Sequence, residues 1–193
     1  EARLEGFDPK RQVNLHPFDR WLLSRLTETV NRATAGMGQY EYSTCVREAE
    51  TFFWKALCDN YLEIAKGRLY GDDPEAKAAA QYTLYTALYT ALRLFAPVMV
   101  HITEELYHGV FMETEKHPSI HVAPWPQRDF MDEEALRLGN RALLVIEEAR
   151  RWKSENNLSM ATPLESVDAP EELKPFEADL LSVTRAARLN YTG

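Results

Sequence analysis

The stretch YSTCVREAETFFWKALCDNYLEIAKGRLY, residues 42–70, determines the fold of this 193-residue chain. It contains no proline, and its single glycine, Gly67, comes near its end. Apolar residues recur at helical spacing, so we predict one continuous amphipathic helix that is contacted from several sides. Lys66 and Arg68 in its last turn suit the negative end of the helix dipole. The residues expected on its buried arc are Val46, Ala49, Phe53, Ala56, Leu57, Asn60 and Ile64.

Further helical patterns lie on both sides of this central helix. We predict helices over residues 17–38, 75–95, 97–111 and 132–153, the last capped by Asp132. Short connections favour antiparallel neighbours, so the first four helices form an up-and-down bundle. The side chains expected to point inward from the later helices are Tyr82, Tyr85, Leu88, Tyr89, Leu92, Phe95, Val98, Ile102, Leu106, Phe111, Ala135, Leu138, Ala142, Val145, Ile146, Ala149 and Trp152.

The pattern is not helical in two other places. Residues 113–131 hold three prolines and are predicted to be irregular, with 120–122 extended and Trp125 packed on the bundle. Beyond residue 153 the apolar period shortens, which predicts strands at 164–167 and 189–191 around a helix over 171–185.

The predicted fold is therefore mainly α, an antiparallel helix bundle with a small α/β C-terminal appendage. We assign residues 16–131 to the bundle, and 132–193 to the fifth helix and the appendage. The chain does not begin with Met, so we expect it to be a piece of a longer polypeptide. Residues 1–15 would then be a linker from a preceding catalytic part.

Composition is that of a soluble globular protein, with 45% hydrophobic and 27% charged residues. No stretch approaches the ~20 apolar residues that span a bilayer, and the start does not resemble a signal peptide. Cys45 and Cys58 lie on different faces of one helix, so they should not pair, which suits a reducing compartment. We expect a cytoplasmic protein without a membrane partner.

The net charge of −8 argues against a general nucleic-acid binder. The charge is uneven, however. Residues 1–70 carry ten basic and ten acidic side chains, whereas residues 71–193 carry twelve and twenty. Any nucleic-acid surface must therefore be local, and the neutral first third is the better place for it.

Four blocks of sequence, in the same order, resemble the anticodon-binding domain of class I aminoacyl-tRNA synthetases of the valine, isoleucine and leucine group. The likeness is greatest to the valine type, and it covers roughly residues 5 to 190. The four blocks are FFWKALCDNYLEIAKGRLY (52–70), LRLFAPVMVHITEELYHGVF (92–111), SIHVAPWP (119–126) and RRWKSENNLSMATPL (150–164).

This resemblance implies a domain that binds the anticodon region of a tRNA and orients it for a catalytic domain elsewhere in the parent chain. That parent would join valine to its tRNA using ATP and Mg²⁺. The HIGH-type and KMSKS-type motifs that handle ATP in class I synthetases are absent, as is any Gly-rich phosphate loop. We therefore expect no catalytic site and no cofactor in these residues. Two alternatives stay open: the same domain of an isoleucyl or leucyl relative, or a helical scaffold that binds protein.

Anticodon loops are single-stranded, so their bases are read by stacking on aromatic or Arg planes, beside cations that hold the phosphates. One strip of the central helix supplies this mixture, and further cations follow at its end and at the end of the fifth helix. The simpler interpretations are a buried Trp54 and cations that only complement helix ends. The predicted tRNA-binding residues are Arg47, Thr51, Trp54, Lys55, Lys66, Arg68, Arg150, Arg151 and Lys153.

Other chemistry has weaker support. His101, Glu105 and His108 share a helix face, but their spacing differs from the zinc-binding H-E-x-x-H pattern, so we interpret them as ordinary helix positions. No base can be paired with a Ser or Cys nucleophile from the sequence.

The expected core position of Leu57 gives a first prediction. Leu57→Ala should lower the free energy of unfolding by about 2–5 kcal/mol, because it opens a cavity in the core. Urea titration followed by circular dichroism measures this change. A loss below about 0.5 kcal/mol, which is typical of a surface site, would show that the helix faces are assigned wrongly.

Overall fold

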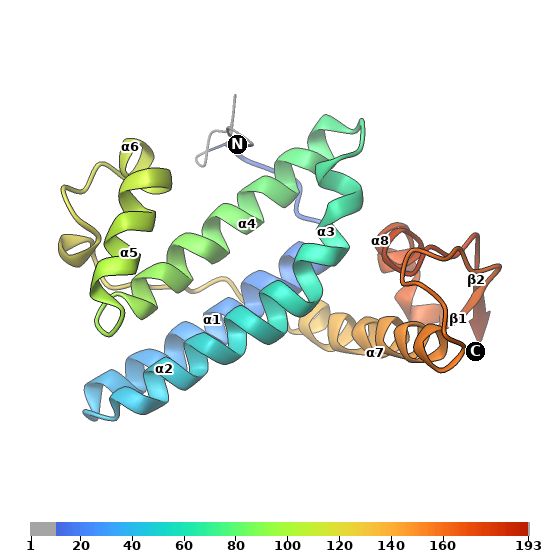
Figure 1. Cartoon of the computed structure of the whole chain (residues 1–193), viewed down its shortest axis with the longest axis horizontal. Helices are drawn as coiled ribbons and strands as arrows, with labels where there is room; N and C mark the ends of the chain where they lie inside the picture. The colour runs from blue at the N-terminus through green and yellow to red at the C-terminus, as the bar shows by residue number, and fades with distance from the viewer. Residues whose placement is uncertain (1–10, 193) are drawn as a thin grey trace.

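The computed structural model describes residues 11–192 (Figure 1). Residues 1–10 and 193 lie outside the described residues, and with them most of the predicted linker. Residues 11–16 have neither helix nor strand. The elements, in which η marks a π- or 3₁₀-helix, are α1 (Pro17–Gly38), α2 (Tyr42–Thr51), η1 (Phe52–Tyr61), α3 (Leu62–Leu69), α4 (Pro74–Phe95), α5 (Val100–Leu106), η2 (Tyr107–Phe111), α6 (Met112–Glu115), η3 (Ile120–Val122), α7 (Glu133–Glu155), β1 (Val167–Pro170), η4 (Glu171–Phe176), α8 (Glu177–Thr184) and β2 (Leu189–Thr192).

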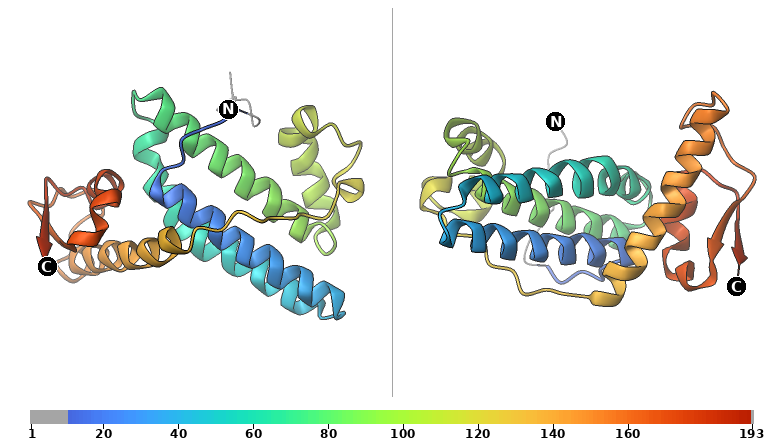
Figure 2. Two further views of the ribbon diagram at one scale, coloured as in Figure 1. Left: turned by 180° about the vertical axis from the view of Figure 1, so that it is seen from behind. Right: turned by 90° about the horizontal axis from the view of Figure 1, so that it is seen from below.

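The bundle is built on a long hairpin of α1 and the α2–η1–α3 helix, with α4 packed against both (Figure 1). The hairpin turns tightly, since Tyr40 has a φ of 61°. The α5–η2–α6 segment packs against the far end of α4, and the chain then returns along α1 to reach α7 (Figure 2). The mainly helical fold class is therefore confirmed. The predicted fourth helix, observed as α5 and η2, packs against only one end of α4.

The central helix is continuous, as predicted, but its middle third, η1, is a π-helix. Its i→i+5 spacing shifts the buried face. Phe52 and Tyr61 are buried as a result, whereas Phe53 and Asn60 are only partly so. Asn60 Nδ2 donates to the Lys55 carbonyl at 2.8 Å, a contact that spans the widened turn. Leu57 is fully buried, as predicted.

Some residues of α4 and of the α5–η2 segment were predicted to point inward but do not. Leu88 is exposed, and the small residues Ala87 and Ala91 face inward in its place. Thr103, Tyr107 and Phe111 are the buried residues of α5 and η2, and only Phe111 was predicted to point inward. The Tyr107 hydroxyl donates to the His117 carbonyl at 2.9 Å. That contact sets which side of the helix faces inward. The predicted inward residues that lie exposed here are Val98, Ile102 and Leu106.

The segment between α6 and α7 holds one correct and one incorrect prediction. Residues 120–122 form a 3₁₀ turn rather than an extended piece, because the Ser119 side chain accepts the His121 amide and so caps the turn. Trp125 does pack on the bundle, and its Nε1 donates to Thr34 Oγ1 at 2.8 Å.

Helix α7 crosses the end of the bundle and carries the appendage (Figure 2). Asp132 caps it by accepting the Ala135 amide at 2.9 Å. That hydrogen bond, together with the charge of Arg20, holds the pKa of Asp132 below its ordinary value. The predicted inward face is buried apart from Trp152, which is half exposed.

The appendage is a small α/β unit at the end of α7. Strands β1 and β2 pair in parallel, with Val167 opposite Leu189, and η4 and α8 connect them. The first strand begins later than predicted, because Leu164 makes only an isolated bridge to Ala186. Ala169, Leu173 and Leu180 join the core of the bundle, so bundle and appendage share one hydrophobic cluster.

The crossing of α1 and α7 gives a second prediction. A Cβ added at Gly139 would lie 2.5–2.8 Å from atoms of the buried Trp21 side chain. Gly139→Ala should therefore cost about 1–2 kcal/mol of stability, because overpacking exceeds the gain in helix propensity. Gly38→Ala is the matched control, since nothing lies within 4 Å of its added Cβ. Equal urea midpoints for the two variants would contradict this close approach.

Candidate nucleic-acid interface

Four of the predicted residues lie together on one face of α2 and η1. All four are exposed, and the exposed fraction of Trp54 is 59%. The indole packs edge-on against Phe53, with centroids 5.1 Å apart, which holds the ring at the surface. The interpretation of Trp54 as a core residue is therefore wrong. We call this face the helix strip: Arg47, Thr51, Trp54 and Lys55.

The charges of the helix strip are accessible. Arg47 makes no ion pair with any residue of the described chain, although the exposed Glu50 is close in sequence. Lys55 pairs with Asp59 at 3.1 Å, with Lys55 76% exposed. An exposed pair of this kind contributes roughly 0–1 kcal/mol, so a phosphate can replace the carboxylate at little cost.

Arg68 does not belong to this surface. Its side chain is only 8% exposed, and its guanidinium donates to both carboxylate oxygens of Asp19 at 2.8 Å. Its Nε lies 3.1 Å from Asp179 on α8. The prediction that Arg68 contacts tRNA is therefore wrong, because its guanidinium is buried, pairs with Asp19 and Asp179, and so ties α3 to α1 and α8.

Tyr61 completes this buried polar cluster by donating its hydroxyl to Asp19. Burial, and then the charge of Asp19, raise the pKa of Tyr61 well above its ordinary value, so the hydroxyl stays protonated. Burial alone would lower the pKa of Arg68, but the hydrogen bonds and charge of Asp19 raise it. Burial raises the pKa of Asp179, and Arg68 opposes that shift. We call Asp19, Tyr61, Arg68 and Asp179 the buried ion-pair cluster.

Two more of the predicted residues meet in a cleft between α3, α7 and α8. Lys66 enters from α3 and Arg150 from α7, and the cleft has a volume of about 720 Å³. Arg150 Nη1 donates to the Asp59 carbonyl and to Asn60 Oδ1, both at 3.2 Å. Asn60 therefore ties η1 to α7. We call this hollow the α3–α7 cleft.

Lys153 also borders the α3–α7 cleft, but its side chain is buried. Its Nζ donates to the carbonyls of Thr184 at 2.8 Å and Met160 at 3.0 Å, and so holds the loop after α7 against the end of α8. Burial, and then the charge of Arg185, lower the pKa of Lys153. The prediction that Lys153 reaches RNA directly is therefore corrected to a role in shaping the cleft.

Arg151 is exposed and lies 4.0 Å from Glu148, and it does not line the cleft. Sequence reasoning missed Arg185, which follows α8 and does line the cleft. The signal was weak, because a single Arg near the end of a predicted helix resembles any solvated charge. It also missed Asp19, whose place in a first helical turn suggested only a dipole contact.

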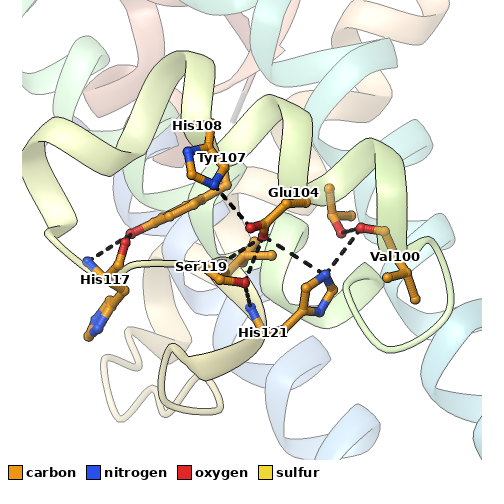
Figure 3. Close-up of polar contacts among 9 residues, drawn as sticks. Val100, Glu104, Tyr107, His108, His117, Ser119 and His121 are labelled. Atoms are coloured by element: carbon orange, nitrogen blue, oxygen red, sulfur yellow. Dashed lines mark hydrogen bonds and ion pairs between the residues drawn. The ribbon is translucent and has the colours of Figure 1, made fainter.

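On α5 and η2, His108 contacts Glu104 and not Glu105, the carboxylate of the trio considered from the sequence. His108 Nε2 lies 3.0 Å from Glu104 Oε1, while the other Glu104 oxygen accepts the Ser119 hydroxyl and the Ile120 amide (Figure 3). Hydrogen bonds to Ser119, Ile120 and His108 outweigh desolvation and lower the pKa of Glu104. Within residues 11–192, no three His, Cys, Asp or Glu side chains gather as metal ligands would.

Two further findings bear on the kind of protein. Cys45 and Cys58 are free thiols, as predicted. None of the helices described for residues 11–192 combines the length and the apolar character that a bilayer span requires.

The mainly helical fold, with an exposed indole among cations, fits a helical RNA-binding domain. A protein-family model described as "Anticodon-binding domain of tRNA ligase" matches residues 19–168. The chain belongs to this family.

Relatives named valine–tRNA ligase match nearly the whole chain. The protein of Pyrococcus horikoshii is 37% identical and that of Thermococcus kodakarensis 40%, each over 98% of this chain. The protein of Methanosarcina barkeri is 41% identical over 86% of this chain. The matched region is 22% of the first two relatives and 19% of the third, so the chain spans about a fifth of their length.

The burial of Arg68 gives a third prediction. Arg68→Met should lower the free energy of unfolding by about 3–5 kcal/mol, because it leaves Asp19 and Asp179 buried without a cation. Lys66→Met, two residues away and exposed, should stay within about 0.5 kcal/mol. Chemical denaturation of both variants measures the difference. A stable Arg68→Met that binds RNA poorly would return Arg68 to the interface.

Proposed function

We propose that this chain is the tRNA-binding part of a valine–tRNA ligase, and that it recognises the anticodon stem and loop. The exposed indole of Trp54, flanked by Arg47 and Lys55, carries this proposal. Stacking of an unpaired base on an aromatic ring is worth about 1–3 kcal/mol, and neighbouring cations hold the adjacent phosphates. The names of the relatives support valine as the amino acid.

The domain orients its ligand and performs no chemistry. By holding the anticodon end of the tRNA, it would place the acceptor end at a catalytic domain in another part of the longer enzyme. ATP and Mg²⁺ would act there. The free thiols fit a cytoplasmic location.

An acidic chain gains selectivity from such an interface. Its net charge of −8 repels nucleic acid in general, so only an RNA that matches the local cationic surface binds well. To distinguish this domain from that of an isoleucine- or leucine-type enzyme, its affinities for tRNA transcripts that accept valine, isoleucine and leucine are compared. A helical protein-binding scaffold would show no salt-dependent affinity for any of them.

This function gives a fourth prediction. Arg47→Ala and Lys55→Ala should each weaken binding of a valine-accepting tRNA transcript, and each should reduce the slope of log K against log salt by roughly 0.7–0.9. Trp54→Ala should weaken binding about tenfold without changing that slope, because it removes a stacking surface and no charge. Fluorescence anisotropy over a salt series measures both quantities.

The matched control is Arg137→Ala, an exposed cation on α7 that pairs with Glu172. It should leave affinity within about twofold, and all four variants should melt within a few degrees of the unsubstituted chain. If Arg137→Ala weakens binding as much as Arg47→Ala does, the effect is one of general charge and the helix strip is not the interface.

A further inference from the structure

The α3–α7 cleft collects positive charge in an otherwise acidic molecule. Four cations line it, against two carboxylates. Both carboxylates already have exposed partners outside or at the rim: Asp59 pairs with Lys55, and Glu63 with Lys66. The remaining lining cations are Arg150, Lys153 and Arg185.

None of these three cations has a carboxylate partner within residues 11–192. Arg150 and Lys153 instead donate to oxygens of the main chain and of an amide, which carry no net charge. The carbonyl of Arg185 accepts the Leu164 amide at 2.9 Å, but its guanidinium makes no hydrogen bond within residues 11–192. Three cations that line one cleft, none of them paired with a carboxylate, favour binding of an anionic group.

Arg150 and Lys153 are held in place before any ligand arrives, and the backbone of Arg185 is fixed at the end of α8. The contacts of Arg150 fix its guanidinium between η1 and α7. Lys153 holds the end of α8, and Arg185, the next residue after that helix, adopts a left-handed conformation with a φ of 57°. Such a site loses little conformational entropy on binding.

An aromatic ring borders the same hollow. Tyr70 lines the cleft beyond the end of α3 and is 86% exposed. An exposed ring beside cations is the combination that binds single-stranded nucleic acid. The volume of about 720 Å³ lies within the range of sites for small molecules and exceeds what a lone phosphate needs.

We propose that the α3–α7 cleft binds one unpaired nucleotide of the RNA, with its phosphate on Arg150 and Arg185 and its base against Tyr70. This inference rests on the proposed function and adds a second contact region to the helix strip. Trp54 and Lys66 are twelve residues apart on one continuous helix, about 18 Å along its axis. A single folded RNA therefore reaches both regions.

The test compares two double variants with the same loss of charge. Arg150→Gln with Arg185→Asn removes the two cations of the cleft, while the amide of Gln retains a donor and Asn tolerates the left-handed backbone. Arg137→Gln with Arg188→Asn removes two exposed cations that pair with Glu172 and Glu165 outside the cleft. The probe is a transcript of the anticodon stem and loop of a valine-accepting tRNA.

The cleft variant should bind at least about tenfold more weakly at low salt, and its slope of log K against log salt should fall by about 1.4, as two lost phosphate contacts on a single strand require. The control should change affinity less than twofold. Tyr70→Ala should weaken binding with an unchanged slope, and Tyr70→Phe should restore it. If the double variant melts early, Arg185→Asn alone should still lower the slope by about 0.7.

Equal effects of the two double variants, with binding by the unsubstituted chain intact, would overturn the cleft proposal and leave the proposed function standing. If the unsubstituted chain shows no salt-dependent binding to the probe, the proposed function fails, and the cleft proposal fails with it.

Discussion

Asp19 is the residue on which the arrangement of the molecule depends. It accepts the His16 amide at the start of α1, the Tyr61 hydroxyl from η1 and two hydrogen bonds from Arg68 on α3. A fully buried carboxylate is costly unless its oxygens are satisfied and its charge is neutralised. Arg68 supplies both, and it also reaches Asp179 in the appendage. One buried ion-pair cluster therefore joins the bundle to the appendage.

This junction fixes the position of the α3–α7 cleft relative to the helix strip. The strip belongs to α2 and η1 and the cleft to α3, α7 and α8, so the position of the cleft relative to the strip is fixed only while α8 stays docked. Lys153 adds a second tie by holding the loop after α7 to the end of α8. The absence of Cβ at Gly67 allows α3 and α8 to approach, since an added Cβ would lie 3.2 Å from Ser182 Cβ. The buried Arg68 and Lys153 thus hold together the helices that carry the exposed cations.

Much of the fold followed from helical periodicity, proline positions and caps, which are local properties of sequence. The π-helix did not follow from these properties, because no residue type marks where an α-helix widens. Its spacing buries Phe52 and Tyr61 in place of the predicted Phe53 and Asn60. For the site, the four residues of the helix strip are exposed, whereas Arg68 and Lys153, which were also predicted to reach RNA, are buried. Their burial depends on partners distant in sequence, Asp179 and the carbonyls of Met160 and Thr184, which no local pattern reveals.

Amide hydrogen exchange on the native chain tests most directly whether the buried cluster locks the appendage onto the bundle. The account predicts that the slowest amides of α8 and β2 open with the same free energy as those of α1, within about 1 kcal/mol, because all three open only in global unfolding. Amides of α8 that exchange at a free energy several kcal/mol lower, while α1 stays protected, would show an appendage that undocks freely and would contradict it.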